Sequence, residues 1–590
     1  INSSNTADWS VILEALESGD VDLLLISPER LANPKFRSDV LPEIGRRSGL
    51  LVIDEAHCIS DWGHDFRPDY RRIARVLGLL PPGVPVLCCT ATANNRVVAD
   101  VSAQLGADMT TVRGPLGRDS LRLHVLEIRG QAERLAWLAE MVPRMPGTGI
   151  VYCLTIRDAL RVAAWLKTRG VNAAAYSSDT ADDQRQWVEQ GLLNNELKVV
   201  VATSALGMGF DKPDLAFVVH FQSPGSPIAY YQQVGRAGRA LETSLGVLLL
   251  GSEDADIQDF FIESAFPRQH QAEQVVALLQ DAGEAMTTAQ ILAAVNLRPT
   301  KLDLMLKTLE VDGAIERDGS RWQRTLRPWS YDVVRAESVT ALRREEQAQM
   351  REYAQADGCR MALIRGYLDD DTSETCGVCD NCTSESLRIG LPHELVLEAV
   401  EFLRSSDLAI DPRKQFPDLK RIPVERRLQP GRALSVWNDA GWGIVVRDGK
   451  YNDTRFSDDL VVASARLIEQ RWGPDPFPSW VASIPSRRSS DLTADFARRL
   501  AEALGLAWNN VVVAVRDTEL QKDMENSAQQ FRNVHGAFAI DGPVPDGPVL
   551  LVDDTVDSRW TFTVVGQLLL GGGSGPVFPF ALADSSGRSA

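Results

Sequence analysis

The sequence predicts an α/β protein of several domains, and three observations predict this fold class. The chain has 590 residues, enough for four domains of about 150 residues each. Through residues 1–260, short apolar runs alternate with helical stretches, which is typical of parallel sheets built from β-α-β units. Residues 471–590 return to this pattern, with VVVAVR (511–516) and VLLVDD (549–554) as strands. Parallel sheets are therefore expected at both ends of the chain.

Seven apolar runs within residues 1–260 predict the strands of the first part. Each run is too short for a helix and rich in Val, Ile and Leu, as strands buried on both faces are. The runs are VDLLLI (21–26), LLVI (50–53), VPVLCC (84–89), GIVYC (149–153), KVVVA (198–202), AFVVHF (216–221) and GVLLL (246–250). Polar residues follow nearly every run, and ligands of open α/β sheets bind beyond the carboxyl ends of the strands. We expect the functional residues there.

Composition and charge limit the class of protein. Apolar residues make up 44% and charged residues 24% of the chain, as in ordinary globular proteins. No uninterrupted apolar run is long enough to span a bilayer, so no membrane association is expected. The net charge of −18 weighs against nucleic-acid binding, although such binding depends on local clusters of Lys and Arg. The chain begins at Ile1 and shows no signal-peptide pattern. Its eight cysteines are too few for a disulfide scaffold. Together these two features predict a reducing, cytoplasmic compartment.

Residues 263–328 predict a small separate module. Thr287 and Thr288 can cap a helix that continues to Val295, and Thr300 can cap a second helix. GAIERDGSRWQRT (313–325) then predicts a hairpin with Asp-Gly at its tip. Two helices followed by a hairpin outline a winged helix. The periodicity fits a small helical packing module equally well.

Four cysteines that follow a long predicted helix indicate a metal site. They are Cys359, Cys376, Cys379 and Cys382, and two residues separate each of the last three. Four thiolates at this spacing fit tetrahedral zinc with no open position, which predicts a structural site. The other four cysteines lie in or beside apolar runs and predict buried thiols: Cys58, Cys88, Cys89 and Cys153.

Two adjacent acids, Asp54 and Glu55, follow the strand LLVI directly. Such a pair suits a magnesium–phosphate site, because one carboxylate can hold the metal while the other polarises the attacking water. His57 can relay the state of that site to a neighbouring lobe. The next loop carries aromatic, imidazole and guanidinium groups, which stack on bases and contact phosphate: Trp62, His64, Phe66 and Arg67.

Residues 1–262 resemble the RecQ family of superfamily-two DNA helicases. The DEAH sequence continues as ISDWGHDFRPDY, close to the aromatic-rich loop of that family. The other matching stretches, in the family's order, are NSSN (2–5), SPERL (27–31), TATA (90–93), VATSALGMGFDKPD (201–214) and YYQQVGRAGRA (230–240). The resemblance implies two RecA-like lobes, with ATP, Mg²⁺ and Zn²⁺ as cofactors.

The resemblance also assigns roles to individual residues. Asp54 would hold magnesium and Glu55 would activate water. Planar, permanently charged guanidinium groups suit the charge spread over a transferring phosphoryl group. The implied catalytic residues are Asp54, Glu55, His57, Gln232, Arg236 and Arg239. The implied nucleotide-contacting or coupling residues are Thr90, Thr92, Gly209, Asp211 and Gly235. The implied DNA contacts are Arg30, the loop residues Trp62, His64, Phe66 and Arg67, and the hairpin residues Arg321, Trp322 and Arg324, although a packing hairpin with exposed arginines remains an alternative.

Three features depart from the family pattern. Gln232-Gln233 stands where Gln-Glu is usual, so one polar contact at the lobe interface is expected to differ. No G-x-x-x-x-G-K-[ST] loop occurs, and this loop would cradle the phosphates. We therefore expect the first lobe to be incomplete and residues 1–590 alone to lack ATP turnover. The candidate winged helix precedes the cysteine cluster, whereas in the family it usually follows the zinc module.

The C-terminal region contains WVASIPSRRSSDLTADFARRLAEALGL (480–506), QQFRNVHGAFAI (529–540) and VLLVDDTVDSRWTFT (549–563). Together these stretches resemble phosphoribosyltransferases, particularly the competence-protein ComF subgroup. The strand that ends in Asp553-Asp554 leads into a hydroxyl-rich loop, which suits a ribose diol and a phosphate. The candidate ligand residues are Asp553, Asp554, Ser558 and Thr561. Such loops normally contain glycine so that the backbone can approach the phosphate, but here the loop reads DSRWT (557–561). We therefore favour a binding or regulatory domain over an active transferase.

The leading hypothesis is an ATP-dependent DNA helicase, moving 3′ to 5′ as the resemblance implies, that acts in recombination and repair at the bacterial nucleoid. Its DNA partners would be single strands and tailed or branched duplexes. The alternatives are a phosphoribosyl-handling protein and a non-catalytic DNA-repair adaptor with a degenerate motor. The expected parts are a partial first lobe (1–113), a second lobe (114–262), a winged-helix-like insertion (263–328), a zinc module (329–388), a basic linker (389–470) and a phosphoribosyltransferase-like domain (471–590).

Overall fold

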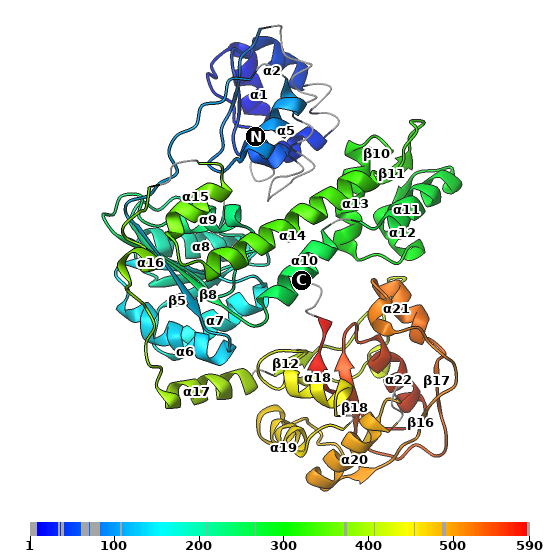
Figure 1. Cartoon of the computed structure of the whole chain (residues 1–590). Helices are drawn as coiled ribbons and strands as arrows, with labels where there is room; N and C mark the ends of the chain where they lie inside the picture. The colour runs from blue at the N-terminus through cyan, green and yellow to red at the C-terminus, as the bar shows by residue number, and fades with distance from the viewer. Residues whose placement is uncertain are drawn as a thin grey trace.

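The computed structural model describes residues 9–33, 36, 40–60, 70, 73, 83–106, 109–207, 209–265, 267–370, 374–405, 407–453, 455–485 and 491–586. Figure 1 shows four bodies: the N-terminal lobe, a second lobe, a small module at the far end of a long helix, and a C-terminal domain. In these described ranges, no helix is both long enough and apolar enough to cross a membrane.

Lobe 1 comprises the described residues up to 106. Its elements are α1 (Trp9–Ser18), η2 (Pro28–Ala32), α2 (Leu41–Arg47), β1 (Leu51–Ile53), η4 (Ala56–Ile59), β2 (Val86–Cys88) and α5 (Asn95–Leu105). β1 and β2 pair in parallel, with Leu51 opposite Val86. Val97 and Val101 of α5 pack with Ile53 in the core of this lobe. The prediction that LLVI and VPVLCC are strands of a parallel sheet is confirmed.

Two expectations for lobe 1 are corrected. Residues 21–26 form no strand, and Leu23 and Leu25 are 75% and 74% exposed. A strand needs a neighbour to satisfy its backbone groups, and the described sheet of this lobe contains β1 and β2 alone. Cys89 is exposed and Cys88 is half-buried, whereas Cys58 and Cys153 are buried as predicted. Cys89 follows the end of β2, where the chain leaves the sheet.

Lobe 2 (residues 114–265) contains a six-stranded parallel sheet. The strand order is β3 (Leu121–Glu127), β8 (Ser244–Leu250), β7 (Leu215–His220), β4 (Thr148–Tyr152), β6 (Val199–Ala202) and β5 (Ala173–Tyr176). The remaining elements are α6 (Gln131–Met141), η5 (Val142–Arg144), α7 (Ile156–Thr168), α8 (Asp182–Leu193), α9 (Pro227–Val234) and α10 (Asp254–Ser264). Two separate apolar clusters include residues of these strands, so the sheet is buried on both faces.

The second-lobe prediction is confirmed for four strands and incomplete for two. β4, β6, β7 and β8 coincide with the predicted apolar runs. β3 was not predicted because Arg122 and His124 interrupt its apolar residues. β5 reads Ala-Ala-Ala-Tyr, and alanine favours helices over strands. Both missed strands hydrogen-bond to strongly apolar neighbours, β8 and β6.

A three-helix module (residues 267–331) follows lobe 2. It consists of α11 (Gln269–Ala282), β9 (Met286–Thr287), α12 (Thr288–Ala294), α13 (Pro299–Val311), β10 (Ile315–Asp318) and β11 (Arg321–Arg324). The strands form an antiparallel sheet in the order β10, β11, β9. Thr287 caps α12, as the sequence predicts, and the structure adds a reciprocal capping box with Gln290. Thr300 caps nothing, because α13 already begins at Pro299, a residue favoured at the first helical position.

The long helix α14 (Val333–Gln355) runs from the three-helix module back to lobe 2 (Figure 1). It is followed by α15 (Arg360–Tyr367), α16 (Asp380–Thr383) and α17 (His393–Arg404). Met350 and Tyr353 of α14 and Met361 and Ile364 of α15 belong to the same apolar cluster as strands of lobe 2. The segment that holds the four cysteines is therefore built onto lobe 2.

The C-terminal domain (residues 407–586) contains a second six-stranded sheet. Its order is β12 (Leu408–Ile410), β13 (Gly431–Val436), β19 (Val577–Asp584), β18 (Val549–Val556), β14 (Trp480–Ser483) and β15 (Ala507–Trp508). All neighbours are parallel except β12 and β13. β16 (Val512–Ala514) and β17 (Phe538–Ile540) form a separate antiparallel pair. The helices are η6 (Val424–Arg426), α18 (Gly443–Tyr451), α19 (Asp458–Arg466), the π-helix η7 (Leu467–Trp472), α20 (Leu492–Leu504), η8 (Gln521–Asp523), α21 (Ser527–Val534) and α22 (Trp560–Gly571).

The expected linker at residues 389–470 is corrected by this sheet. β12 and β13 lie within that range and pair with the rest of the C-terminal sheet. α18 and α19 also lie within it, and Val446 and Leu460 belong to the apolar core of the domain. Basic residues from Arg413 to Arg427 separate β12 from β13 in the sequence, so the alternation of strands and helices was not recognised there.

Candidate functional site at the interface between the two lobes

The predicted acid pair lies just after β1. Asp54 is exposed, and Glu55 adopts a left-handed backbone conformation with φ of 50°. A non-glycine residue rarely occupies this region, and such strain is concentrated at functional sites. Glu55 Oε2 lies 3.2 Å from Nδ1 of His57, whose side chain is 1% exposed. The same nitrogen lies 3.0 Å from the hydroxyl of Thr90, at the end of β2. Three of the predicted residues are thus in contact.

A hydrogen bond joins this group to lobe 2. The Thr92 amide donates to the Thr90 hydroxyl at 3.3 Å. The Gln232 amide Nε2 of α9 donates to the buried hydroxyl of Thr92 at 2.5 Å. A series of polar contacts therefore leads from Glu55 through His57, Thr90 and Thr92 to Gln232. It connects the strand-end acid of one lobe with a helix of the other.

Gln233, which departs from the family pattern, lies inside lobe 2 instead of at the interface. Its Oε1 is 2.7 Å from Nε2 of His220, a residue of β7 that is 1% exposed. Burial lowers the pKa of His220 to about 4, although the hydrogen bond to Gln233 acts in the opposite direction. The ring is therefore neutral at physiological pH, and a neutral amide is a compatible partner. The interface contact belongs to the preceding residue, Gln232.

The predicted arginines lie against the segment that follows β6. Arg236 donates from Nη1 to the Phe210 carbonyl at 2.9 Å, and Arg239 pairs with Asp211 at 2.7 Å. Gly209 has φ of 87°, a conformation that suits glycine. A Cβ on Gly235 would lie 2.8 Å from the Tyr231 carbonyl oxygen, so this position also favours glycine. These residues form one surface of lobe 2, next to the helix that carries Gln232.

The four predicted zinc ligands converge. The Sγ atoms of Cys359, Cys376, Cys379 and Cys382 all lie within 4.8 Å of one another. Zn–S bonds of about 2.3 Å in a tetrahedron place sulfurs about 3.8 Å apart, so an all-sulfur set at this spacing fits zinc. Burial raises the pKa of the Cys359 thiol, but hydrogen bonds from the backbone amides of Cys376 and Ala362 and from the Cys376 and Cys382 side chains together bring the pKa to about 7. Burial raises the pKa of the Cys376 thiol to about 12 in the same cluster. A lowered thiol pKa favours the thiolate that a metal ion requires.

Two acids near this cluster, Asp369 and Asp370, were not singled out from the sequence. Asp369 accepts a hydrogen bond from the backbone amide of Asn95, at the start of α5 in lobe 1, at 2.6 Å. Asp370 accepts from the amide of Leu116 at 3.0 Å and pairs with Arg365 at 2.9 Å. The segment beside the cysteines thus touches lobe 1 and the connection between the lobes. A run of three aspartates in a loop gives no sequence signal for such contacts.

The DNA-contact predictions have different outcomes. NSSN (2–5), Trp62, His64, Phe66 and Arg67 lie outside the described residues. Arg30 lies on η2 and is half-buried. Arg321 of β11 is exposed and donates to the Ala285 carbonyl at 3.0 Å. Arg324 is half-buried and donates to the carbonyls of Ala314 and Arg327.

The expectation for Trp322 is corrected. Its side chain is 5% exposed, belongs to the apolar core of the three-helix module and donates to the Thr288 hydroxyl at 3.2 Å. Successive residues of a strand face opposite sides, so Trp322 faces the core where its neighbour Arg321 faces solvent. Trp322 stabilises the module and is not available to stack on a base.

Residues of the C-terminal candidate site contact other side chains of the same domain. Asp554 pairs with Lys450 at 2.8 Å, and burial together with the neighbouring Asp554 charge raises the pKa of Asp553 well above its usual value. Trp560 belongs to the predicted phosphate loop (557–561), but it is fully buried at the start of α22 and donates to Ser527 Oγ at 2.9 Å. The Arg413 guanidinium lies 4.2 Å from the centre of its ring and donates to the Ser558 carbonyl.

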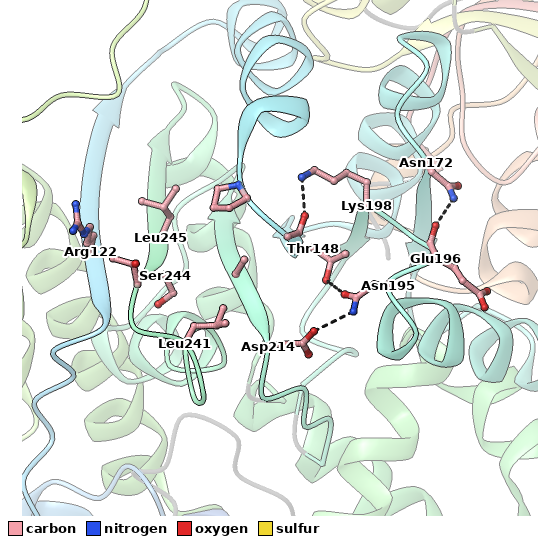
Figure 2. Close-up of a pocket in the computed structure, with 14 residues that line it drawn as sticks. Arg122, Thr148, Asn172, Asn195, Glu196, Lys198, Asp214, Leu241, Ser244 and Leu245 are labelled. Atoms are coloured by element: carbon pink, nitrogen blue, oxygen red, sulfur yellow. Dashed lines mark hydrogen bonds between the residues drawn. The ribbon is translucent and has the colours of Figure 1, made fainter.

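A surface cavity of about 860 Å³ lies on lobe 2 but away from these residues. Figure 2 shows its polar lining, in which Asn195 bonds to Thr148 at 3.0 Å and to Asp214 at 3.1 Å. Lys198 donates to the carbonyls of Met145 and Gly147 at 2.5 and 2.7 Å. The lining residues lie at the amino ends of the strands, whereas the predicted site residues follow the carboxyl ends. The cavity is not part of the lobe interface.

Three family descriptions match parts of the chain. They are "DEAD/DEAH box helicase" over residues 3–101, "Helicase conserved C-terminal domain" over 133–241 and "RecQ zinc-binding" over 317–383. The chain is thus similar to RecQ-type helicases through both lobes and the cysteine cluster.

Curated relatives agree with these matches. The chain is 38% identical over 270 residues to the ATP-dependent DNA helicase RecQ of Bacillus subtilis, which covers 45% of each chain. It is 34% identical over 267 residues to the probable ATP-dependent DNA helicase RecS of the same organism, covering 44% of this chain and 52% of that one. It is 37% identical over 241 residues to the RecQ-like DNA helicase BLM of Xenopus laevis, covering 40% of this chain and 17% of that one. The chain therefore spans about half the length of the two bacterial relatives.

Proposed function

We propose that this chain, whose lobes and cysteine cluster match those of RecQ-type helicases, belongs to an ATP-dependent DNA helicase. The observation that carries the proposal is the series of contacts from Glu55 through His57 and the two threonines to Gln232. A motor needs such a link, because hydrolysis in one lobe must change how that lobe contacts the other. The 3′ to 5′ direction and the role in recombination and repair rest on the resemblance alone.

The proposed chemistry follows from the side chains at the interface. Asp54 is the exposed acid that would hold Mg²⁺, and the bound ion would neutralise phosphate charge. Glu55 polarises the attacking water, and His57 holds the Glu55 carboxylate in place at 3.2 Å. Arg236 and Arg239 supply fixed positive charge from lobe 2, close to Gly209 and the segment that follows it.

We propose single-stranded and tailed or branched duplex DNA as the partner. The three-helix module supports this proposal, because three helices with a three-stranded antiparallel sheet fit a winged helix. Its cationic side chains near the start of α13, Arg298 and Lys301, suit phosphate at the positive end of a helix. The zinc ion would hold α15 and α16 together and so fix the segment that touches both lobes.

The C-terminal domain is proposed to bind or regulate, without transferase activity. Phosphate loops use glycine to bring backbone amides close to the ligand, whereas the corresponding loop here (557–561) contains the buried indole of Trp560. The same loop is held by Arg413 through the Ser558 carbonyl. A phosphoribosyl-handling enzyme is therefore the weaker alternative for the protein.

Glu55→Gln tests the proposed motor. The protein used in this test has an added segment before residue 2. This segment carries the glycine-rich phosphate loop that ATP hydrolysis requires. We expect DNA-stimulated phosphate release to fall by about a hundredfold or more, because a positioned base contributes 10²–10⁴-fold, while ATP still binds. Steady-state phosphate release with a tailed duplex and equilibrium binding of a fluorescent ATP analogue measure the two effects.

Glu14→Gln is the matched control, because Glu14 is an exposed acid of α1 in the same lobe and is expected to leave hydrolysis unchanged. Parental rates of phosphate release in Glu55→Gln would contradict the assignment. Loss of ATP binding together with hydrolysis would show that Glu55 acts on nucleotide affinity instead of on the attacking water.

A further inference from the structure

The C-terminal domain contacts the three-helix module through the segment 521–527. In Figure 1, α21 lies next to α12, although the two helices are far apart in the sequence. Asn296, in the turn between α12 and α13, donates to the Asp523 carbonyl at 2.8 Å. Its side-chain oxygen accepts from the amide of Glu525 at 2.7 Å. A reciprocal pair of hydrogen bonds therefore ties this turn to the other domain.

The Asn526 side chain hydrogen-bonds to the ends of two helices that belong to different domains. Its Oδ1 accepts from the Gln529 amide at 3.0 Å and so caps the start of α21 in its own domain. Its Nδ2 donates to the carbonyls of Leu292 in α12, Val295 at the end of that helix and Leu297 in the turn that follows, at 3.1, 2.6 and 3.2 Å. The last carbonyls of a helix need partners, and here another domain supplies one. Asn526 is 5% exposed, so these bonds are shielded from water.

Acidic groups of the C-terminal domain meet the cations at the start of α13. Glu525 Oε2 lies 3.6 Å from Nζ of Lys301, with side chains 21% and 23% exposed. Burial raises the pKa of the Asp557 carboxyl, while the nearby charge of Arg298 acts to lower it. The Arg298 guanidinium also lies 6.0 Å from the ring centre of Phe260 on α10. Carboxylates of the C-terminal domain thus lie where phosphates would approach the positive end of α13.

We propose that the C-terminal domain covers the α12–α13 turn and competes with the DNA backbone for it, so that the three-helix module reaches DNA fully only when this contact opens. The proposal rests on DNA as the partner in the proposed function. Asn526 and the backbone of Glu525 bind this turn, while the Glu525 carboxylate pairs with Lys301 and the Asp557 charge acts on Arg298. Undocking therefore releases the hydrogen-bonding groups of the turn and these two cations together. If about nine-tenths of the molecules are docked, the apparent affinity of the module for DNA is about tenfold weaker.

Asn526→Asp separates this interface from the stability of the C-terminal domain. An aspartate keeps the oxygen that caps α21, but it replaces the donating amide with a carboxylate that the three carbonyls repel. We expect amide exchange in residues 292–301 to become at least tenfold faster, and the Kd for a tailed duplex to fall about tenfold at fixed salt. The added negative charge would itself weaken DNA binding, so a gain in affinity cannot come from charge.

Asn510→Asp is the matched control, because Asn510 is an exposed asparagine of the same domain. It is expected to change neither amide exchange nor Kd. Unchanged exchange in Asn526→Asp would overturn the docking, and faster exchange with an unchanged or higher Kd would overturn the competition. Absence of DNA binding in the parent and in Asn526→Asp alike would overturn the proposed function as well, whereas binding in the parent without a gain in the variant overturns only this inference.

Discussion

Cys379→Ser is expected to reduce bound zinc from about one ion per chain to nearly none and to lower the thermal stability of lobe 2. Cys379 is fully buried, and its side chain belongs to the apolar cluster that contains strands of lobe 2. Structural zinc contributes an apparent binding free energy of about 10–16 kcal/mol in small zinc-dependent folds, and most of that would be lost. Elemental analysis of purified protein and thermal unfolding measure the two effects.

Cys89→Ser is the matched control, because Cys89 is an exposed cysteine of lobe 1 outside the cluster. It should retain the parental zinc content and stability. Full zinc occupancy in Cys379→Ser would contradict the four-sulfur site. Loss of zinc without any loss of stability would show that the segment beside the cysteines holds its position through Asp370 and Arg365 alone.

Local rules explain which elements were predictable. β4, β6, β7 and β8 are continuous apolar runs, and Thr287 caps α12 as its position before the helix predicts. β3 and β5 were not predicted, because they form strands by pairing with apolar neighbours. Such pairing depends on the tertiary structure and leaves no local pattern in the sequence. β12 and β13 were missed for a similar reason, since the sheet that defines them is completed by β19, at the far end of the chain.

The sequence predicted which residues form the candidate site better than it predicted how they contact one another. Asp54, Glu55 and the four cysteines were identifiable because their chemistry depends on adjacent or regularly spaced residues. The contact between Thr92 and Gln232 joins two lobes and has no local signature. The direction in which Trp322 points was likewise not evident, because a strand places alternate residues on opposite faces and composition does not say which face is buried.

The second large effect is expected at the contact between lobe 2 and the C-terminal domain. Arg161 of α7 pairs with Asp439, which follows β13, at 2.8 Å, and their side chains are 7% and 8% exposed. Asp439→Asn keeps the size of the side chain and an oxygen for the amides of Gly441 and Gly443, but it removes the carboxylate that pairs directly with buried Arg161. Asp158 Oδ1, at 3.9 Å, is the remaining carboxylate beside Arg161. Removing one partner of a buried pair costs about 3–5 kcal/mol. We expect the lower end of this range, because Arg161 retains a hydrogen bond to Gln131 at 3.4 Å.

The matched control for this prediction is Asp303→Asn on α13. Asp303 and Lys307 form an ion pair at 2.9 Å, but their side chains are 60% and 43% exposed, so water replaces the lost interaction and the expected cost is below about 0.5 kcal/mol. Denaturant unfolding followed by tryptophan fluorescence compares the two variants. A small loss for Asp439→Asn together with faster amide exchange in α7 would mean that the domain undocks and lets Arg161 reach water. A small loss with unchanged exchange would contradict the buried pair as a determinant of how the C-terminal domain is held on lobe 2.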